Sequence, residues 1–150
     1  MIRKVLLISA IVVLITFAFF WDRTNNANSN EFLVTKVIDG DTIKLSNDKE
    51  VRLLGIDTPE KGQYYYDEAK NFLDDLVSGK KVILEKDVTN KDNYGRYLRY
   101  VLCDDIFVNL EMVKGGYARV VIRVPDMKYA DILMKAETDA RKKQIGIWKN

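Results

Sequence analysis

Residues 32–60 of this 150-residue chain read FLVTKVIDGDTIKLSNDKEVRLLGIDTPE. Apolar and polar residues mix in three short segments, at Phe32 to Ile38, Thr42 to Ser46 and Glu50 to Ile56. Such segments are typical of strands with one buried face, and the pair Asn47-Asp48 suits a hairpin turn between the second and the third. The stretch therefore predicts a three-stranded meander.

The segments that follow extend the meander toward a barrel. Apolar residues recur at helical spacing from Tyr64 to Val77 and stop before Gly79, which predicts an amphipathic helix with Tyr65 in the core and its tyrosine neighbours partly exposed. Strand character returns at Lys81 to Val88 and at Tyr97 to Cys103. Five strands interrupted by one helix favour a small barrel, closed or partly open.

The last third of the chain predicts two more helices. Val108 to Lys114 has the pattern of a short helix ended by a glycine pair, and Ala118 to Ile122 is expected to be extended. A final helix is expected to begin at Pro125, because proline suits the first helical position. Basic residues from Arg141 to Lys143 lie toward the negative end of that helix.

The chain has no histidine and a single cysteine, Cys103. Their scarcity excludes Ser-His-Asp and Cys-His catalysis, zinc sites with the usual ligands, and nucleases that use histidine as acid or base. An intramolecular disulfide is also excluded, so we interpret Cys103 as a small buried residue. Acid–base chemistry must fall to carboxylates, lysine or tyrosine, and carboxylate oxygens favour calcium, magnesium or manganese.

Residues 1–30 consist of an apolar leader and a polar linker. Two basic residues precede an apolar run from Val5 to Trp21. The run is short for a membrane-spanning helix and long for the core of a signal peptide, so an uncleaved anchor and a cleaved signal peptide both stay open. We favour the anchor because no good cleavage site follows closely. In either case the positive amino-terminal end places the remaining domain, residues 31–150, outside the cytoplasm.

The domain that follows the leader is electrically balanced. The whole chain has 24 Lys and Arg residues and 22 Asp and Glu residues; three of the basic and one of the acidic residues precede residue 31, which leaves 21 of each. Non-specific nucleic-acid binders are usually basic. Composition therefore gives no support to a nucleic-acid partner, and any recognition of phosphate must be local.

Two carboxylates, Asp41 and Asp57, are placed to converge. Asp41 lies in the turn between the first two predicted strands and Asp57 follows the third, so adjacent strands bring both to one edge. Carboxylates about 4 Å apart repel each other by on the order of 4 kcal/mol unless a cation lies between them. The ordinary alternative is that Asp39-Gly40-Asp41 only forms a turn, since turns select Asp and Gly.

Arg52, Glu60 and Arg96 complete a set suited to phosphodiester chemistry. Arginines can clamp a phosphate, and Glu60 can position or deprotonate a water. Each also has an ordinary reading, as a strand cation, an acid leading into a helix and a loop cation. Arg52 and Asp57 are five residues apart, so they converge only if the chain bends after Ile56. The joint occurrence favours a metal-dependent phosphodiesterase.

Four motifs occur in order along the chain, at Val37 to Thr42, Arg52 to Glu60, Tyr94 to Arg96 and Val108 to Ala118. In these motifs the chain resembles the staphylococcal nuclease-like, or thermonuclease, family, and the resemblance extends over the whole domain. It implies a fold that is mainly β with α, an OB-fold barrel of five strands with three helices. This expectation agrees with the strand and helix pattern.

The resemblance also implies a metal site and a group that acts on water. Asp41 and Asp57 would be calcium ligands together with the main-chain carbonyl of Thr58, with magnesium or manganese as alternatives. Glu60 would hold or deprotonate the attacking water.

The remaining implied roles concern the substrate. Arg52 and Arg96 would contact the scissile phosphate, most strongly as negative charge builds there, and Tyr94 would contact the substrate. DNA and RNA would both be cut, with little sequence preference, to leave 3'-phosphates. We expect a monomer by default.

Two positions depart from the family's pattern. Asn93 stands where the family has a lysine, and Ile122 aligns with an aromatic residue that stacks on a nucleobase in the type member. Stacking on a base contributes about 1 to 3 kcal/mol, so we expect altered substrate binding. An inactive or weak binding module at the membrane is the alternative function; the presence of all the acidic and arginine positions favours the enzyme.

Overall fold

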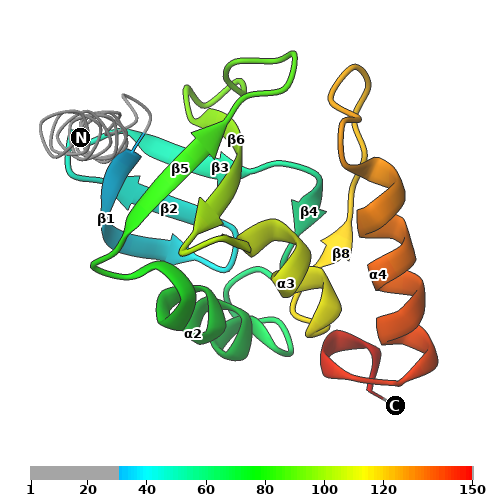
Figure 1. Ribbon diagram of the computed structural model, residues 1–150. Helices are drawn as coiled ribbons and strands as arrows, with labels where there is room; N and C mark the ends of the chain where they lie inside the picture. Colours follow the sequence, from blue (N-terminus) through cyan, green and yellow to red (C-terminus); the bar gives the residue numbers. More distant parts are fainter. Residues whose placement is uncertain (1–30, 150) are drawn as a thin grey trace, which may run out of the picture. The chain divides into compact units, whose positions relative to one another are not determined.

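In the computed structural model, which describes residues 31–149, the predicted meander forms one side of a small barrel (Figure 1). The strands β1 (Glu31–Asp39), β2 (Thr42–Leu45) and β3 (Glu50–Leu53) pair antiparallel in sequence order. The predicted hairpin turn joins β2 to β3, and Asp48 there has a φ of 62°. Aspartate tolerates this left-handed conformation better than most residues, which suits it to the turn.

Two further strands close the barrel. The strand β5 (Lys81–Glu85) lies beside β1, and β6 (Tyr97–Cys103) pairs antiparallel with β5. The other edge of β6 runs parallel to β3, so the order β1-β2-β3-β6-β5 returns to β1. A two-residue strand, β7 (Ile106–Phe107), extends β6 as a hairpin. The expected five-stranded barrel of the OB type is confirmed.

Three α-helices and a short 3-10 helix surround the barrel in the described residues. Their bounds are α2 (Tyr66–Val77), α3 (Val108–Lys114), α4 (Ala130–Lys142) and η1 (Gly146–Trp148). In Figure 1, α2 lies at the lower end of the barrel as drawn, and α4 runs beside the short strand β8 (Arg119–Val120). The predicted α3 is confirmed with its bounds.

The third predicted strand is divided in two. β3 ends at Leu53, and Gly55 has a φ of 76°, a left-handed conformation that favours glycine. The chain then forms β4 (Ile56–Asp57), which pairs antiparallel with β8 in a separate two-stranded sheet. The bend that the sequence requires therefore falls before Ile56, not after it, because glycine is the residue that permits it.

The predicted start of the last helix is wrong. Its first residue is Ala130, and Pro125 lies in a turn that precedes it, after a cis peptide bond. In this turn the Asp126 amide donates to the Arg123 carbonyl at 2.8 Å. The Asp126 carboxylate accepts from the amides of Val88 and Thr89, so it caps another loop and not a helix.

The expectation that Tyr65 belongs to the core is also wrong. Tyr65 is half-buried and has a φ of 70°, so α2 begins one residue after it. Its ring packs against the rings of Tyr64 and Tyr117, with centroids 5.4 and 5.6 Å apart. The left-handed turn carries the side chain sideways from the apolar stripe of the helix.

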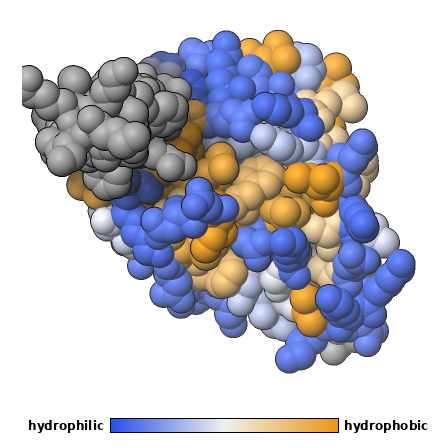
Figure 2. Space-filling model, viewed as in Figure 1, coloured by the Kyte–Doolittle hydropathy of each residue, from blue (hydrophilic) through white to orange (hydrophobic). Residues whose placement is uncertain are grey.

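The core lies inside the barrel and between the barrel and the helices. Cys103 is buried there, as predicted. Figure 2 shows hydrophobic residues gathered in a band across the middle of one face, flanked by polar residues. The largest fully buried side chains are those of Tyr100, Ile43, Leu45, Leu53, Leu73, Met112 and Leu133.

The predicted leader, residues 1–30, lies outside the described residues, and the division into leader and domain stays a prediction. From residue 31 to residue 149, the helices are all too short or too polar to cross a membrane.

Candidate functional site

Asp41 occupies the tight turn between β1 and β2 and is buried, with 6% of its surface exposed. Its Oδ1 accepts a hydrogen bond from the Thr42 hydroxyl at 3.0 Å. Its Oδ2 accepts from the Thr58 amide and hydroxyl at 3.2 and 3.1 Å. A Cβ on Gly40 would lie 2.7 Å from the Thr58 hydroxyl oxygen, so only glycine lets the turn approach Thr58 this closely.

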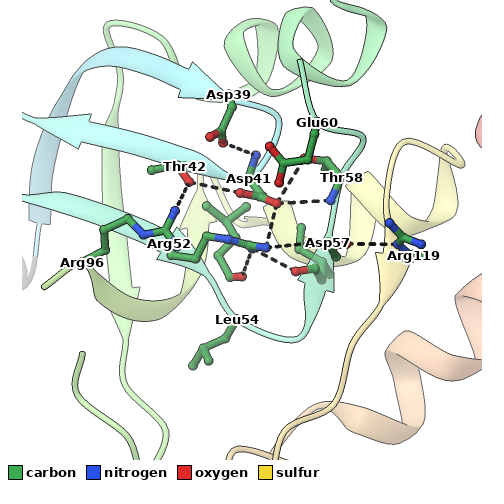
Figure 3. Close-up of polar contacts among 12 residues, drawn as sticks. Asp39, Asp41, Thr42, Arg52, Leu54, Asp57, Thr58, Glu60, Arg96 and Arg119 are labelled. Carbon is green, nitrogen blue, oxygen red and sulfur yellow. Dashed lines mark hydrogen bonds and ion pairs between the residues drawn. The ribbon is translucent and has the colours of Figure 1, made fainter. Parts of the chain in front are cut away.

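Arg52 joins the two predicted metal ligands. Its Nη2 lies 2.9 Å from Asp41 Oδ2 and 3.1 Å from Asp57 Oδ1, and Figure 3 shows the guanidinium between the two carboxylates. Its Nη1 donates to the carbonyls of Leu53 and Ile56 at 3.0 and 2.9 Å. The bend around Gly55 therefore wraps around the guanidinium, and Asp57 returns to meet Arg52.

The electrostatic balance at Asp41 favours additional positive charge. Burial raises the pKa of Asp41 to about 6; the Arg52 guanidinium opposes this, and the Asp39 carboxylate adds to it. The charged form is thus less stable than in water even with Arg52 in place. A cation placed at this carboxylate would stabilise its charged form.

Arg96 is held above the same turn by the loop between β5 and β6. Its Nε lies 2.7 Å from Asp92 Oδ2, and its amide donates to Asp92 Oδ1 at 3.0 Å. Its Nη1 donates to the Thr42 hydroxyl at 3.3 Å, and Thr42 in turn donates to Asp41. Burial alone would raise the pKa of Asp92, but the hydrogen bonds from Arg96 outweigh it and lower that pKa.

Tyr94 and Glu60 are exposed, and both line the same cleft as the carboxylates. The Tyr94 side chain is 86% exposed, and the Arg96 guanidinium carbon lies 5.5 Å from the centroid of its ring. The Glu60 carboxylate points toward Asp41 in Figure 3 and has no hydrogen bond or ion pair within the described part of the chain. Its amide donates to the Gln63 side chain at 2.8 Å, which fixes the local backbone.

Six of the seven predicted site residues line one cleft. Thr58 is the exception, because it is buried beneath Asp41. The structure therefore brings together residues that are spread over more than fifty positions of the sequence. The six are Asp41, Arg52, Asp57, Glu60, Tyr94 and Arg96.

Sequence reasoning missed Arg119, Asp92 and Thr42. Arg119 lies opposite Asp57 in the β4–β8 pair, and its Nε is 3.0 Å from Asp57 Oδ2, so an arginine faces each oxygen of Asp57. Strands of two residues leave no periodicity, so this pairing had no signal in the sequence. The sequence did carry a signal for Asp92, because an acidic residue four positions before Arg96 in a turn is well placed to pair with it.

The residues present fit a hard divalent cation, although they supply only part of its ligands. Across residues 31–149, Asp, Glu and Cys do not gather in threes around a point that suits a metal ion. Asp41 and Asp57 nevertheless both contact Arg52 Nη2, so one oxygen of each lies close to a common point. Calcium and magnesium complete their shells with main-chain oxygens, water or substrate oxygens.

Comparison with known proteins gives the same family as the motifs. The family described as "Staphylococcal nuclease homologue" matches residues 50–150. The chain is 36% identical over 159 residues to a thermonuclease of Staphylococcus intermedius, with 96% of this chain and 95% of that protein covered. It is 37% identical over 135 residues to a thermonuclease of Staphylococcus hyicus, with 84% and 80% covered.

A third relative comes from a different genus. An uncharacterized endonuclease of Haemophilus influenzae is 34% identical over 150 residues, with 97% of this chain and 79% of that protein covered. The family match spans more than half of the chain, and these relatives align over most of both sequences. The chain belongs to the family of staphylococcal nuclease homologues.

Proposed function

We propose that this domain is a calcium-dependent nuclease that hydrolyses phosphodiester bonds in both DNA and RNA. Membership of the family makes the chain a phosphodiester-cleaving hydrolase. The observation that supports the finer proposal best is the shared cleft, where two carboxylates bridged by one guanidinium face a second arginine and a carboxylate without a partner in the described residues. Such a set can bind a cation and an anion side by side.

Asp41 and Asp57 would hold the cation, with the main-chain carbonyl of Thr58 beside them. The available ligands are all oxygens, which suit calcium, magnesium and manganese alike, and we favour calcium on the resemblance to the family. A cation bound there supplies Lewis-acid polarisation of the phosphate. Buried Thr58 fixes the Asp41 carboxylate through two hydrogen bonds, so this ligand is oriented before any metal arrives.

Arg52 and Arg96 would bind the scissile phosphate. Arg52 can turn toward a phosphate only by giving up its bonds to the two carboxylates, and those carboxylates accept the exchange when another positive charge takes its place. Arg96 is oriented by Asp92 through Nε and its amide. Both guanidinium groups stabilise the charge that builds on the phosphate in the transition state.

Glu60 would position or deprotonate the attacking water, and Tyr94 would contact the substrate. The Glu60 carboxylate is exposed at the cleft and points toward Asp41 (Figure 3), so it would act on a water that lies between it and the cation site. The exposed Tyr94 ring offers an apolar surface to a sugar or base. We propose 3'-phosphates as products.

The place of action follows from the leader and is likewise a proposal. Residues 1–30 would anchor the domain outside the cytoplasm, or direct its secretion if they are cleaved. A monomer suffices for the chemistry, since one chain supplies all the cleft residues.

Cleavage of single-stranded DNA and RNA by the full chain in mild detergent tests the proposal. We expect cutting with calcium, none with a chelator, and 3'-phosphate ends by mass spectrometry. The control Glu60→Ala should lower kcat by about 100-fold or more. Equal cutting by Glu60→Ala would refute its role. A folded chain that cuts nothing with calcium, magnesium or manganese would favour a binding module.

A further inference from the structure

Arg123 differs from the other arginines of the described residues in having no side-chain partner. Every other arginine from residue 31 to residue 149 has at least one. Their partners are Asp41 and Asp57 for Arg52, Asp92 for Arg96, Asn90 for Arg99, Asp57 for Arg119, and Glu137 for Arg141. An exposed guanidinium without a partner is free to bind an anion from solution.

Arg123 lines the same cleft as the predicted catalytic residues. Arg52 and Arg96 are the other cations among the described residues that line it. Both of these hold carboxylates, and each must exchange or share that bond when a phosphate binds. Arg123 gives up no such bond, so its contact with an anion carries no exchange cost.

The backbone around Arg123 is fixed on both sides. On one side the Val121 amide donates to the Gly55 carbonyl at 3.0 Å, at the bend that positions Asp57. On the other, the Arg123 carbonyl accepts from the Asp126 amide at 2.8 Å. The backbone at Arg123 is therefore held in a fixed position relative to the carboxylate site, although the Arg123 side chain is exposed.

Asp126 connects the backbone around Arg123 to the loop that carries Arg96. It is 5% exposed, and its Oδ1 accepts from the amides of Val88 and Thr89 at 3.0 and 2.8 Å. In Figure 1 the loop between β8 and α4 and the loop between β5 and β6 rise at the same end of the domain. These hydrogen bonds connect the two loops, so the backbone segments that carry Arg123 and Arg96 are held together.

We propose that Arg123 binds a phosphate of a single-stranded nucleic acid next to the scissile one. A strand whose scissile phosphate is held by Arg52 and Arg96 continues through the cleft, and its neighbouring phosphate meets the remaining cation that lines it. The proposal rests on the proposed function, which it extends from one phosphate to two. It makes substrates with several phosphates bind better than those with a single one.

Equilibrium binding in a chelator tests the contact without cleavage. The probe is a fluorescein-labelled oligothymidylate, and its anisotropy with the full chain in mild detergent is measured at several salt concentrations. Each phosphate contact to a single strand contributes about 0.7 to the slope of log affinity against log salt. Arg123→Gln should lower the slope by about that amount, Arg123→Glu by at least as much, and Arg123→Lys should restore it.

The matched control is Lys142→Gln. Lys142 is an exposed cation at the end of α4 and does not line the cleft. Lys142→Gln removes one positive charge, as Arg123→Gln does. We expect the wild-type slope from this variant. A slope lowered as much by Lys142→Gln as by Arg123→Gln would overturn the proposal, because the effect would then be one of general charge.

Kinetics with calcium separate this contact from the chemistry. With an oligonucleotide substrate, Arg123→Gln should raise KM several-fold at unchanged kcat, since the contact is equal in ground and transition states. With a dinucleotide, which has one phosphodiester and no neighbouring phosphate, KM should not change. A wild type that cuts while Arg123→Gln matches it in salt slope and KM overturns the inference. A wild type that binds through Arg123 but never cuts supports the inference and refutes the nuclease proposal.

Discussion

At the scale of single residues, Arg52 organises the site. One guanidinium contacts the carboxylates of Asp41 and Asp57 and two main-chain carbonyls, so it closes the bend and offsets part of the charge of these two carboxylates. A cation between the same carboxylates would take over the neutralisation but not the contacts to the carbonyls. Arg52 should therefore matter most for stability when no metal is present.

Arg52→Gln tests whether Arg52 matters most for stability when no metal is present. Removing one partner of a mostly buried ion pair costs about 3 to 5 kcal/mol, so the variant should lose about that much free energy of unfolding in a chelator. Calcium should then stabilise the variant more than the wild type, because the ion no longer competes with a guanidinium. Denaturant unfolding followed by circular dichroism, with and without calcium, measures both effects.

The control for this prediction is Arg99→Gln. Arg99 contacts Asn90 and the Leu98 carbonyl, and it does not line the cleft, so calcium should stabilise this variant no more than the wild type. Equal calcium-induced stabilisation in Arg52→Gln and the wild type would show that the ion does not bind between Asp41 and Asp57.

At the scale of elements, α3 supports the site through Asn109. This side chain is fully buried; its Oδ1 accepts from the Val101 amide of β6 at 2.9 Å, and its Nδ2 donates to the Leu54 carbonyl at 2.8 Å. Leu54 lies in the bend between β3 and β4 that returns Asp57 to Arg52. One amide thus connects a helix, a barrel strand and the bend.

Asn109→Ala should therefore weaken both the fold and the site. It leaves two buried main-chain groups without partners, at about 1 to 3 kcal/mol each, so we expect a loss of about 2 to 6 kcal/mol in unfolding free energy. Asn109→Asp would bury a carboxylate against the Leu54 carbonyl oxygen, so it should lose at least as much stability as Asn109→Ala. Chemical denaturation measures all three. A loss within about 0.5 kcal/mol, which is ordinary for surface substitutions, would contradict the prediction.

The sequence predicts an element well where a local pattern decides its formation. The strands up to Leu53 and α3 have clear apolar patterns, and they form as expected. The start of α4 was missed because Asp126 caps the amides of a loop 37 and 38 residues away, a competition invisible to local rules. β4 and β8 are two residues each, too short for any periodicity.

The candidate site divides in the same way. The predicted acidic and basic residues were found through motifs, and the structure gathers them, but the sequence did not show that Arg52 lies between the two carboxylates. That contact depends on a left-handed Gly55, which the sequence did not distinguish from other glycines. Arg119 and Arg123 come from the segment after the last motif, and only the folded chain places them near the others.

At the scale of the whole molecule, side-chain contacts join the segment that precedes α4 to the barrel. Just before α4, Lys128 forms an ion pair with Glu85 of β5, and the Tyr129 hydroxyl donates to the other Glu85 oxygen at 2.8 Å. Burial alone would raise the pKa of Glu85, but these two hydrogen bonds outweigh it and lower that pKa below the ordinary 4.5. The contact between β5 and the segment before α4 therefore depends on an ionised Glu85.

The sign of the resulting pH dependence follows from linkage. The folded chain keeps Glu85 ionised at pH values where the unfolded chain takes up a proton, so the contribution to stability is fully present above about pH 4.5 and is lost as pH falls through the lowered folded pKa. The difference in unfolding free energy between wild type and Glu85→Gln should be constant from about pH 7 to pH 5 and should shrink toward pH 3.

Urea denaturation at several pH values measures this difference, and Glu68→Gln serves as the control. Glu68 is exposed on α2, and within the described residues its carboxylate has no hydrogen bond or ion pair, so its removal should change stability little at any pH. A difference for Glu85→Gln that stays constant down to pH 3, or that grows there, would show that the ionised carboxylate does not hold the segment before α4 to the barrel. Because Arg123 and Asp126 precede α4, the weakening at low pH should also reduce oligonucleotide affinity in the wild type more than in Glu85→Gln.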